Sequence, residues 1–487
     1  PAQIETRGIP KIPDELADKI KPYLNIRTVQ FQDWQVSGAN FTVLITLRPE
    51  KGQVNQLHVL NKPNKKPRQI TFGKNPVHRA MLNPLDDRSI IFLRDDGGSE
   101  KFQVFHYDLA TGKTSKITDG ENRHTSIHWS PKGDRIGYFS PKRNGRDNDL
   151  YVADPSRPGS EKLLLKLSGG GWGIEDWSSD GRMLLIVEYV SINESRLYMV
   201  DSITSEISLL TPKLNVPVSH QNARFDPQLK AVYFTSDDGF DFQRLTRLDL
   251  NSGQYFYYLS QIKWDVESFE VSPNGELLAV VTNEGAMSRL RFLNAKNGVE
   301  ILEPSKPQGV ISRLKWGANA EIMYGLSSAL SPGQVVYYDI SSKKKLYWMA
   351  TALSSIKADS LSLPVREEMR SADGSKMDAW VYRPGRIVNG RFLPFVPSQP
   401  APVVILFHGG PESQFRPRFM GRYNYLISEE KIVMICPNVR GSRGYGKSFL
   451  RADNGREREK VLLDIEQIYN AIAADPSLDQ NRIAVMG

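Results

Sequence analysis

Trp129–Ser140 reads WSPKGDRIGYFS, which is an aromatic residue, a Pro-Gly turn and a short apolar strand in succession. Clear copies of this unit are WSSDGRMLLIVE from Trp177, FDPQLKAVYFTS from Phe225 and VSPNGELLAVVT from Val271. Fainter copies begin at Val36, Leu82 and Trp316. The seven copies are spaced by 45 to 48 residues, so the sequence contains an internal repeat.

A second landmark keeps the same period. In each copy an apolar strand ends before a polar turn in Asp or Asn, at Asn61, Asp108, Asp154, Asp201, Asp249, Asn294 and Asp339. Pro, Gly, Asn and Asp set turn geometry, and the β-branched and aromatic runs between them have the length of strands. About four strands per repeat, seven times over, predicts a seven-bladed β-propeller. A β-sandwich and a solenoid of strands are the alternatives.

The composition narrows the class of protein further. The chain has 487 residues, 40% hydrophobic and 24% charged, which excludes a collagen, a coiled coil and a disordered tail. One cysteine, Cys436, excludes an internal disulfide framework and a multi-cysteine metal site. The net charge, 63 − 55 = +8, is mild and indicates a weak preference for anionic partners, not a nucleic-acid-binding protein.

Neither a membrane span nor a secretion signal is expected. No apolar run reaches the ~18 residues of a transmembrane helix. The first residues, Pro1-Ala2-Gln3-Ile4, do not begin a signal peptide. The compartment stays open between the cytoplasm and, after removal of a signal, the bacterial periplasm or the exterior.

The pattern changes near residue 360. Short strands are expected at Val365–Met369 and Met377–Tyr382, followed by a surface loop over 385–402. Continuous apolar runs, typical of strands buried on both faces, then follow at Val403–Phe407, Ile432–Cys436 and Ile483–Met486. A helix is expected at Asp464–Ala474, where apolar residues recur at helical spacing. Strands separated by helices predict a parallel sheet covered on both faces, in an α/β domain.

Two glycine-rich segments follow strands of this sheet. HGGPESQ, His408–Gln414, has two glycines at a strand end, where backbone amides can stabilise charge on a carbonyl oxygen, as an oxyanion hole does. NVRGSRGYG, Asn438–Gly446, follows the next strand. Ligands of α/β sheets bind at the carboxyl ends of strands, so both segments are candidates for one site. Their plain alternatives are a tight turn and a structural loop.

The third segment is NRIAVMG, Asn481–Gly487, a strand that runs into glycine. A G-x-S-x-G nucleophile elbow begins in this way, which would place a serine two residues after Gly487. An ordinary strand end is the alternative.

Taken together, HGGP, NVRGSRGYG and DxNRIAVMG in this order, behind a seven-bladed propeller, resemble the prolyl oligopeptidase family of serine peptidases. The resemblance is greatest to its acylaminoacyl-peptidase and dipeptidyl-peptidase-like branches. It implies a seven-bladed β-propeller at 27–355 followed by the N-terminal part of an α/β-hydrolase domain at 356–487, with an extension at 1–26 that packs on the hydrolase domain. The chain would then be part of a longer polypeptide.

The resemblance also implies roles for named residues. Gly410 would donate one oxyanion hydrogen bond, with His408 and Gly409 shaping the turn. Arg440, Gly441 and Tyr445 would line a loop on the substrate side, and Asp464 would be structural. The nucleophile, the triad Asp and the triad His would all lie beyond Gly487. The family further implies short peptides as substrates, access restricted by the propeller, no metal and no cofactor; a homo-oligomer is compatible with it.

Other interpretations stay open. The intact protein is a serine peptidase, a non-catalytic propeller that binds partners, or an esterase on the same core. The residue order of 441–448 also fits a phosphate-binding loop. His124 and His128 could form a metal-binding pair, and Cys436 could be a catalytic thiol. Glu175-Asp176 is an acidic pair of the kind that binds a substrate amine. Exopeptidase and endopeptidase activities are not separated.

Overall fold

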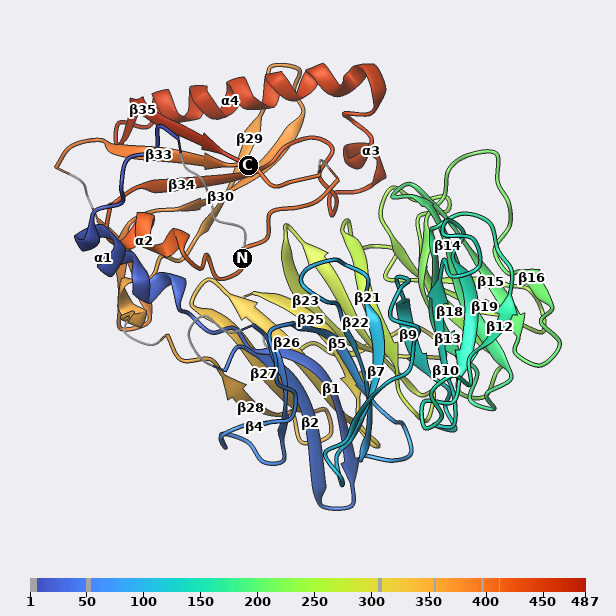
Figure 1. Cartoon of the computed structure of the whole chain (residues 1–487). Coiled ribbons are helices and arrows are strands. Elements are labelled where there is room, and N and C mark those ends of the chain that lie inside the picture. The colour runs from blue at the N-terminus through green and yellow to red at the C-terminus, as the bar shows by residue number, and fades with distance from the viewer. Residues whose placement is uncertain (1–6, 50–53, 305–308, 354–355, 396–397, 411) are drawn as a thin grey trace.

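The computed structural model describes residues 7–49, 54–304, 309–353, 356–395, 398–410 and 412–487. It confirms the predicted class of fold: a β-propeller of seven four-stranded sheets is followed by the start of an α/β-hydrolase sheet. The two parts lie one above the other, with the propeller below the five-stranded sheet in the view of Figure 1.

Each blade of the propeller is built from four consecutive antiparallel strands. Blades 1 to 4 comprise β1–β4 (Gln30–Ser37, Asn40–Leu47, Gln56–Leu60, Arg68–Gln69), β5–β8 (Val77–Leu82, Ser89–Arg94, Gln103–Asp108, Thr114–Lys116), β9–β12 (Thr125–Trp129, Ile136–Ser140, Asp149–Ala153, Lys162–Leu165) and β13–β16 (Trp172–Trp177, Met183–Ser191, Glu194–Asp201, Ile207–Leu209). Blades 5 to 7 comprise β17–β20 (His220–Phe225, Ala231–Ser236, Arg244–Asp249, Tyr255–Tyr258), β21–β24 (Asp265–Val271, Leu277–Glu284, Met287–Asn294, Glu300–Leu302) and β25–β28 (Val310–Trp316, Glu321–Ser328, Ser331–Asp339, Lys344–Ala350).

The first strand of each blade lines the central channel, a cavity of about 450 Å³. In all seven blades its pairing with the second strand shifts register once, for example between Phe31 and Asp33. Such bulges bend a strand and increase its twist. The shared bulge therefore gives the blades a common inner geometry, which a closed ring of seven requires.

The aromatic residue of the repeat joins neighbouring blades. The indole Nε1 of Trp129 donates to Met81 O of the preceding blade (3.3 Å), and that of Trp316 donates to Glu270 O (3.0 Å). Trp34 donates in the same way to Lys315 O (2.8 Å) and thereby links blade 1 to blade 7. These three tryptophans therefore tie neighbouring blades together.

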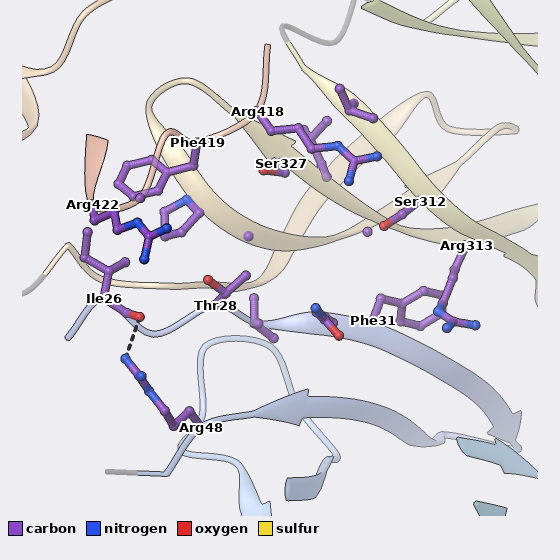
Figure 2. A pocket seen from close by; sticks show the side chains of 18 of the residues that line it. Ile26, Thr28, Phe31, Arg48, Ser312, Arg313, Ser327, Arg418, Phe419 and Arg422 are labelled. Atoms are coloured by element: carbon purple, nitrogen blue, oxygen red, sulfur yellow. Dashed lines mark hydrogen bonds between the residues drawn. The ribbon is translucent and has the colours of Figure 1, made fainter. Parts of the chain in front are cut away.

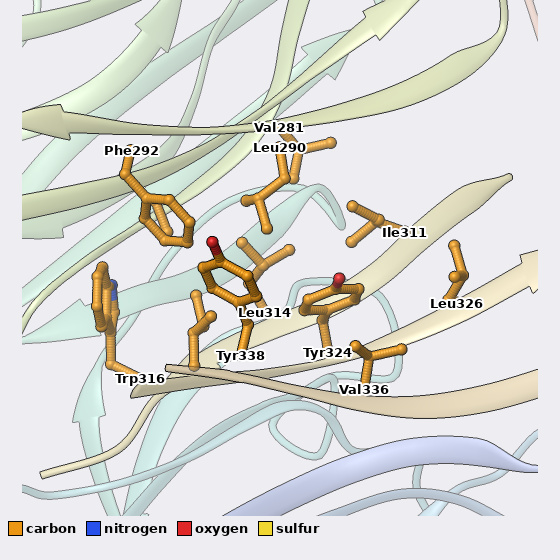
Figure 3. Close-up of a cluster of buried hydrophobic side chains, with 12 residues drawn as sticks. Val281, Leu290, Phe292, Ile311, Leu314, Trp316, Tyr324, Leu326, Val336 and Tyr338 are labelled. Carbon is orange, nitrogen blue, oxygen red and sulfur yellow. The ribbon is translucent and has the colours of Figure 1, made fainter. Parts of the chain in front are cut away.

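Apolar packing fills the space between adjacent blades. Between blades 6 and 7 the ring of Phe292 stacks on Tyr338 at 5.8 Å and meets the edge of Trp316 at 5.9 Å (Figure 3). The surrounding cluster draws on both sheets, from Val281 to Val336. Burial of this kind contributes roughly 25 cal/mol per Å² of apolar surface, so the blades hold one another in place.

The C-terminal α/β part is a mixed sheet of order β29-β30-β34-β33-β35. Its strands are β29 Val365–Arg370, β30 Lys376–Tyr382, β33 Ala401–Leu406, β34 Val433–Asn438 and β35 Leu478–Met486. β33, β34 and β35 run parallel, as predicted, whereas β30 pairs antiparallel with β34. The helices are α1 Asp14–Leu24, α2 Tyr423–Ser428, α3 Lys447–Leu450 and α4 Val461–Ala474, with 3-10 turns η1 Ala358–Ser360 and η2 Gly455–Lys460.

The two faces of this sheet are covered differently (Figure 1). α4 buries Ile468 and Ile472 on one face. The other face packs against Ile427 of α2 and against Ala286 and Ala329 from the propeller. The propeller thus supplies part of the core of the α/β part.

The N-terminal helix α1 lies beside α2. Tyr23 meets the Tyr425 ring edge-on at 5.5 Å and donates a hydrogen bond to Glu429 Oε1 (2.6 Å). Its burial and the nearby carboxylate raise the pKa of Tyr23. Helix α1 is therefore fixed to the α/β part.

The expectation of a surface loop over residues 385–402 is wrong in part. The stretch expected to be a surface loop contains a hairpin, β31 Gly385–Val388 and β32 Arg391–Pro394. Its turn residues Asn389 and Gly390 have φ of 49° and 74°. Two successive positive φ values match a type I′ turn, for which Asn-Gly is the preferred pair. The Pro and Gly content of the stretch obscured that signal.

Candidate active site

Three chain segments converge at the carboxyl edge of the parallel strands. β33 and β35 are in register, with Leu406 opposite Met486, and β34 pairs on the other side of β33. The backbone N–H of Phe407 donates to Met486 O (2.9 Å), which extends the ladder to the strand ends. The turn at 408–410, the loop at 439–446 and Gly487 therefore share one edge of the sheet.

The turn after β33 has the geometry that its glycines allow. Gly410 has φ of 49°, and a β carbon placed there would meet nothing within 4 Å. Gly409 and Gly410 are both exposed, and Gly410 O accepts a hydrogen bond from Ser413 N (2.9 Å). Pro411 lies outside the described residues. The open side and the left-handed backbone leave the turn accessible to a ligand.

His408 holds this turn against the neighbouring loop. Its Nε2 lies 2.8 Å from Ser442 Oγ, and Ser442 donates its only proton to Val439 O (2.6 Å). Ser442 therefore accepts from Nε2 of His408, and Nδ1 makes a longer contact of 3.3 Å with Gly409 O. Burial lowers the pKa of His408, so the neutral ring is favoured. With Nε2 engaged as a donor, His408 positions the turn and is not arranged to act as a general base.

Asn438, at the end of β34, ties the two glycine-rich segments together. Its Oδ1 accepts from Phe415 N (2.7 Å), and its Nδ2 donates to Phe415 O (3.1 Å) and to Tyr445 Oη (3.0 Å). The side chain is fully buried. Tyr445 also meets the edge of the propeller's Trp264 at 5.8 Å. Tyr445 is therefore a contact between the loop and the propeller.

Arg440 occupies a buried ion-pair cluster beneath the loop. Its side chain is 3% exposed and donates Nη2 to Asp464 Oδ1 (2.6 Å) and Nη1 to Asp373 Oδ2 (2.7 Å). The backbone N–H of Arg440 also donates to Asp464 Oδ2 (2.8 Å), and Ser371 donates to the same carboxylate. The guanidinium holds the pKa of Asp373 below its usual range. We therefore propose that Arg440 supports the loop from beneath and does not contact substrate.

Glycine is required at position 441 by the close approach of Asp453. Gly441 has φ of 92°, and a β carbon there would overlap the Asp453 carboxylate. Its N–H donates to Phe449 O (3.0 Å), which closes the loop onto α3. A side chain at this position would meet both backbone strain and a steric clash.

Between the loop and the propeller lies a cavity of about 140 Å³. The propeller side contributes four acidic residues, Asp237, Asp241, Asp265 and Glu267, and the loop contributes Arg443 and Lys447. The turn connects to this wall, since Arg443 N donates to Ser413 O (3.1 Å).

Ion pairs across the cavity join the two parts. Lys447 Nζ donates to Asp237 Oδ1 (3.0 Å), and Arg416 pairs with Glu267 while donating to Ala286 O (3.0 Å). Burial raises the pKa of Asp265 to about 6. These groups come from residues far apart in the sequence, and sequence reasoning missed them.

Several buried polar atoms at this interface have no hydrogen-bond partner among the described residues. They are Gln243 Oε1, Glu267 Oε2 and Asn283 Oδ1, and all three residues line the cavity. Buried polar groups are almost always satisfied, by protein, water or ligand. The unsatisfied atoms therefore mark this cavity as a place where a polar ligand or water binds.

The acidic pair Glu175-Asp176 lies elsewhere, in the central channel of the propeller. Glu175 lies 3.7 Å from Arg224, and Asp176 Oδ2 accepts from Phe225 N (2.8 Å). Its partners belong to the propeller, so the interpretation of this pair as an amine-binding motif gains no support.

The remaining alternatives also gain no support. Lys447, the lysine of the phosphate-loop spelling, is bound to Asp237 and Pro217 O of the propeller. Burial raises the pKa of Cys436, the opposite of thiol activation. In the part of the chain that the structure describes, no group of three His, Cys, Asp or Glu side chains is placed to hold a metal, and no helix is long and apolar enough to cross a membrane.

A seven-bladed propeller stacked on an α/β-hydrolase sheet, with an open glycine turn at the carboxyl end of β33, defines a two-domain hydrolase class. Residues 16–351 match the family described as prolyl oligopeptidase, N-terminal beta-propeller domain, and residues 417–487 match the prolyl oligopeptidase family. The first match alone covers more than half of the chain, so this chain belongs to the prolyl oligopeptidase family. The resemblance inferred from the sequence is confirmed.

Individual relatives are distant. Dipeptidyl aminopeptidase BIII of Pseudoxanthomonas mexicana is 23% identical over 420 residues, and dipeptidyl-peptidase 5 of Porphyromonas gingivalis is 22% identical over 428 residues; each alignment covers 82% of this chain. The chain spans 58% of the length of each of these relatives.

Solved structures share the fold. A prolyl endopeptidase structure aligns with a TM-score of 0.81 at 15% identity, over 97% of this chain and 70% of that one. A puromycin hydrolase structure aligns with a TM-score of 0.77 at 16% identity, over 94% and 73%.

Proposed function

We propose that the intact protein is a serine peptidase that hydrolyses short peptides by acyl transfer. The observation that carries the proposal is the open turn at Gly410, which lies on the same sheet edge as Gly487 at the end of β35. A serine two residues beyond Gly487 would emerge at this edge, beside the turn. The Gly410 N–H is then the oxyanion donor that this chain supplies.

The remaining triad groups are assigned outside residues 1–487. After residue 356 the sequence contains one histidine, His408, and its Nε2 donates to Ser442. A serine nucleophile needs an imidazole that accepts its proton. We therefore assign the nucleophile, the Asp and the His of the triad to residues that follow Gly487.

The propeller restricts access in this proposal. Its blades 5 and 6 stand over the loop at 439–446, and the cavity left between them holds about 140 Å³. A folded protein does not fit into a space of that size, whereas the end of an extended peptide does. The contacts that narrow this cavity also favour a peptidase over an esterase that acts on small free substrates.

Labelling with a serine-directed fluorophosphonate tests the proposed chemistry. The native intact protein is expected to take up one equivalent of probe, because the activated serine is the only group that reacts at neutral pH. Mass spectrometry of the labelled peptide locates the site. Heat-denatured protein is the control. Absence of labelling on native protein would favour the non-catalytic propeller instead.

We further propose that the substrate enters with its free amino terminus toward the propeller, as the names of the dipeptidyl relatives suggest. The cavity wall there carries the unpaired Glu267 Oε2 and the Asp265 carboxylate, and a protonated amine would satisfy both. Asp237 is paired with Lys447 and Glu267 with Arg416, so Asp241 and Asp265 are the lining acids that remain to attract a cation.

Substitution of Asp265 with asparagine tests this orientation. The KM for a chromogenic dipeptide amide with a free amine is expected to rise about tenfold, since a charge-assisted hydrogen bond is lost. The KM for its N-acetylated counterpart should not change. Asp238→Asn, an acid beside the cavity that does not line it, is the matched control.

The same group predicts a pH dependence. Burial raises the pKa of Asp265 to about 6, and an acid loses its negative charge below its pKa. Amine binding should therefore weaken as the pH falls through about 6, with Arg244, Asp237 and Asp241 as the other charges acting on Asp265. If both substrates respond equally, or neither responds to Asp265→Asn, the amine is bound elsewhere and the acylaminoacyl or endopeptidase interpretation is preferred.

A further inference from the structure

A second cavity, of about 650 Å³, lies at the seam between the first and last blades. Its walls come from β1 and the residues before it, from β25 and β26 of blade 7, and from residues 418–422, which precede α2 (Figure 2). It is therefore bounded by both the propeller and the α/β part. None of the residues at 408–410 or 439–446 lines it.

All the charged side chains that line this cavity are positive. Arg48, Arg313, Arg418 and Arg422 line it, and no aspartate or glutamate is among the described residues of the lining. In the view of Figure 2, Arg48 and Arg422 lie on the left, Arg418 at the top near Ser327, and Arg313 at the right near Phe31. Four guanidinium groups that share one cavity repel one another unless an anion is present.

These arginines form no ion pair with an acidic side chain among the described residues. Arg48 donates to the backbone carbonyls of Ile26 (2.9 Å) and Leu24 (3.4 Å), which are neutral acceptors. Arg422 lies over the ring of Tyr423, with its Cζ 5.4 Å from the ring centroid. Within the described part of the chain the guanidinium groups of Arg313 and Arg418 make neither a hydrogen bond nor an ion pair.

A neighbour on the same segment shows what a paired arginine looks like here. Arg416 pairs with Glu267 and donates to Ala286 O and Ser288 Oγ (both 3.0 Å). Arg418, two residues later, has none of these contacts. The segment that crosses to the propeller thus carries one arginine with a full set of partners and one without.

The ionisation of the two central arginines reflects this lack of partners. Burial lowers the pKa of Arg313 and of Arg418. The charges of Asp33 and Glu267 act in the opposite direction, but they offset the effect of burial only in part. Both residues are nevertheless exposed to solvent at the cavity wall, so water and dissolved anions reach them.

The cavity also has the other features of a small-molecule site. Its volume falls in the usual range of about 300–1,000 Å³ for ligand pockets. Thr28, Ser312 and Ser327 contribute hydroxyl groups, and Phe31 and Phe419 contribute apolar surface. Guanidinium groups bind the oxygens of phosphate in a bidentate manner, and one phosphate chain can serve several of them at once.

We propose that this cavity binds a small phosphate-bearing polyanion, with Arg313 and Arg418 as the principal ligands and Arg48 and Arg422 as further ligands. Because Arg313 belongs to the propeller and Arg418 to the α/β part, the bound anion bridges the two parts. Binding therefore stabilises the observed arrangement of the two parts. The proposal does not depend on the peptidase activity.

Calorimetric titration of the intact protein with inorganic tripolyphosphate tests the site. One saturable site is expected, and its affinity should fall as NaCl is raised, because Arg313 and Arg418 are exposed and salt screens exposed charges. The thermal unfolding midpoint should rise with tripolyphosphate concentration. Arg313→Gln and Arg418→Gln should each weaken binding about tenfold, and the double variant should abolish it.

Matched controls separate this site from general attraction to a basic protein. Arg391→Gln removes an exposed positive charge from the β31–β32 hairpin and should leave binding unchanged. Without ligand, the double variant should unfold no earlier than the parent, because it loses two unpaired charges. Earlier unfolding would mean that the arginines are structural and would contradict the proposal.

Other probes decide the class of ligand. Citrate, a tricarboxylate, and penta-glutamate, an acidic peptide, should bind more weakly than tripolyphosphate. Tighter binding of either one would overturn the assignment to phosphate. No saturable heat at about 10 mM tripolyphosphate, where even a millimolar site is occupied, would overturn the site itself.

Discussion

Replacement of Arg440 with methionine is expected to lower the free energy of unfolding by about 3–5 kcal/mol, the usual loss when one partner of a buried ion pair is removed. Asp464 is 1% exposed and accepts four hydrogen bonds, two of them from the Arg440 guanidinium. Without that cation its carboxylate stays buried with no counter-charge. The loop at 439–446 rests on this cluster, so its order should decline as well.

Urea denaturation followed by tryptophan fluorescence and by far-UV circular dichroism measures the effect. Two domains need not unfold together, so the transition of the α/β part is the one to compare. Arg482→Met is the control: Arg482 pairs with Asp479 at the surface, its side chain is 52% exposed, and its loss should cost under about 1 kcal/mol. Equal effects of the two substitutions would show that the Arg440 cluster contributes no more than a surface pair.

Replacement of Gly410 with alanine is expected to lower kcat of the intact enzyme by up to about 10²-fold, with a smaller change in KM. A β carbon there meets no neighbouring atom, so the substitution acts through the backbone. Alanine disfavours φ of 49°, and relaxation of the turn moves the N–H proposed to stabilise the oxyanion. Because that hydrogen bond strengthens in the transition state, the loss falls on kcat.

Gly390→Ala provides the matched control. Gly390 also has positive φ, 74°, and a β carbon added there would also meet nothing within 4 Å, but it lies in the β31–β32 hairpin. Both substitutions should cost similar stability, whereas only Gly410→Ala should slow the chemistry. Steady-state kinetics at saturating substrate compare them. An unchanged kcat in Gly410→Ala would remove Gly410 from the oxyanion site.

The two proposed sites both lie between the propeller and the α/β part, but their charged residues differ. The cavity at blades 5 and 6 joins the domains through ion pairs such as Lys447–Asp237 and Arg416–Glu267. Among its described lining residues, the arginine-lined cavity at blades 1 and 7 has no acidic group of its own, so an anion would complete it.

Much of the fold could be predicted from the sequence because its determinants are local. Each blade carries its own turn residues, strand lengths and aromatic residue, and this information repeats every 45 to 48 residues. The parallel strands of the α/β part were equally visible as apolar runs. The hairpin at 385–394 was missed although its Asn389-Gly390 signal is local, because prolines and arginines around it favoured a loop.

The turn at His408–Gly410 could also be located from the sequence, since a strand followed by two glycines is a local pattern. Its neighbours could not. Arg440 reads as a loop arginine that could face a substrate, and only the structure shows it bound to Asp373 and Asp464, 67 and 24 residues away. Whether an arginine is a ligand or a support depends on which carboxylates the fold brings to it.

By itself, then, the sequence determined the seven blades, the α/β sheet and the position of the glycine turn, because strand periodicity and turn chemistry act over a few residues. The tertiary structure alone decided which charges meet. Asp265 and Glu267 face the loop of the α/β part, and Arg313 and Arg418 share a cavity although 105 positions separate them. Electrostatic interactions depend on distance in space and on burial, and neither follows from the order of residues.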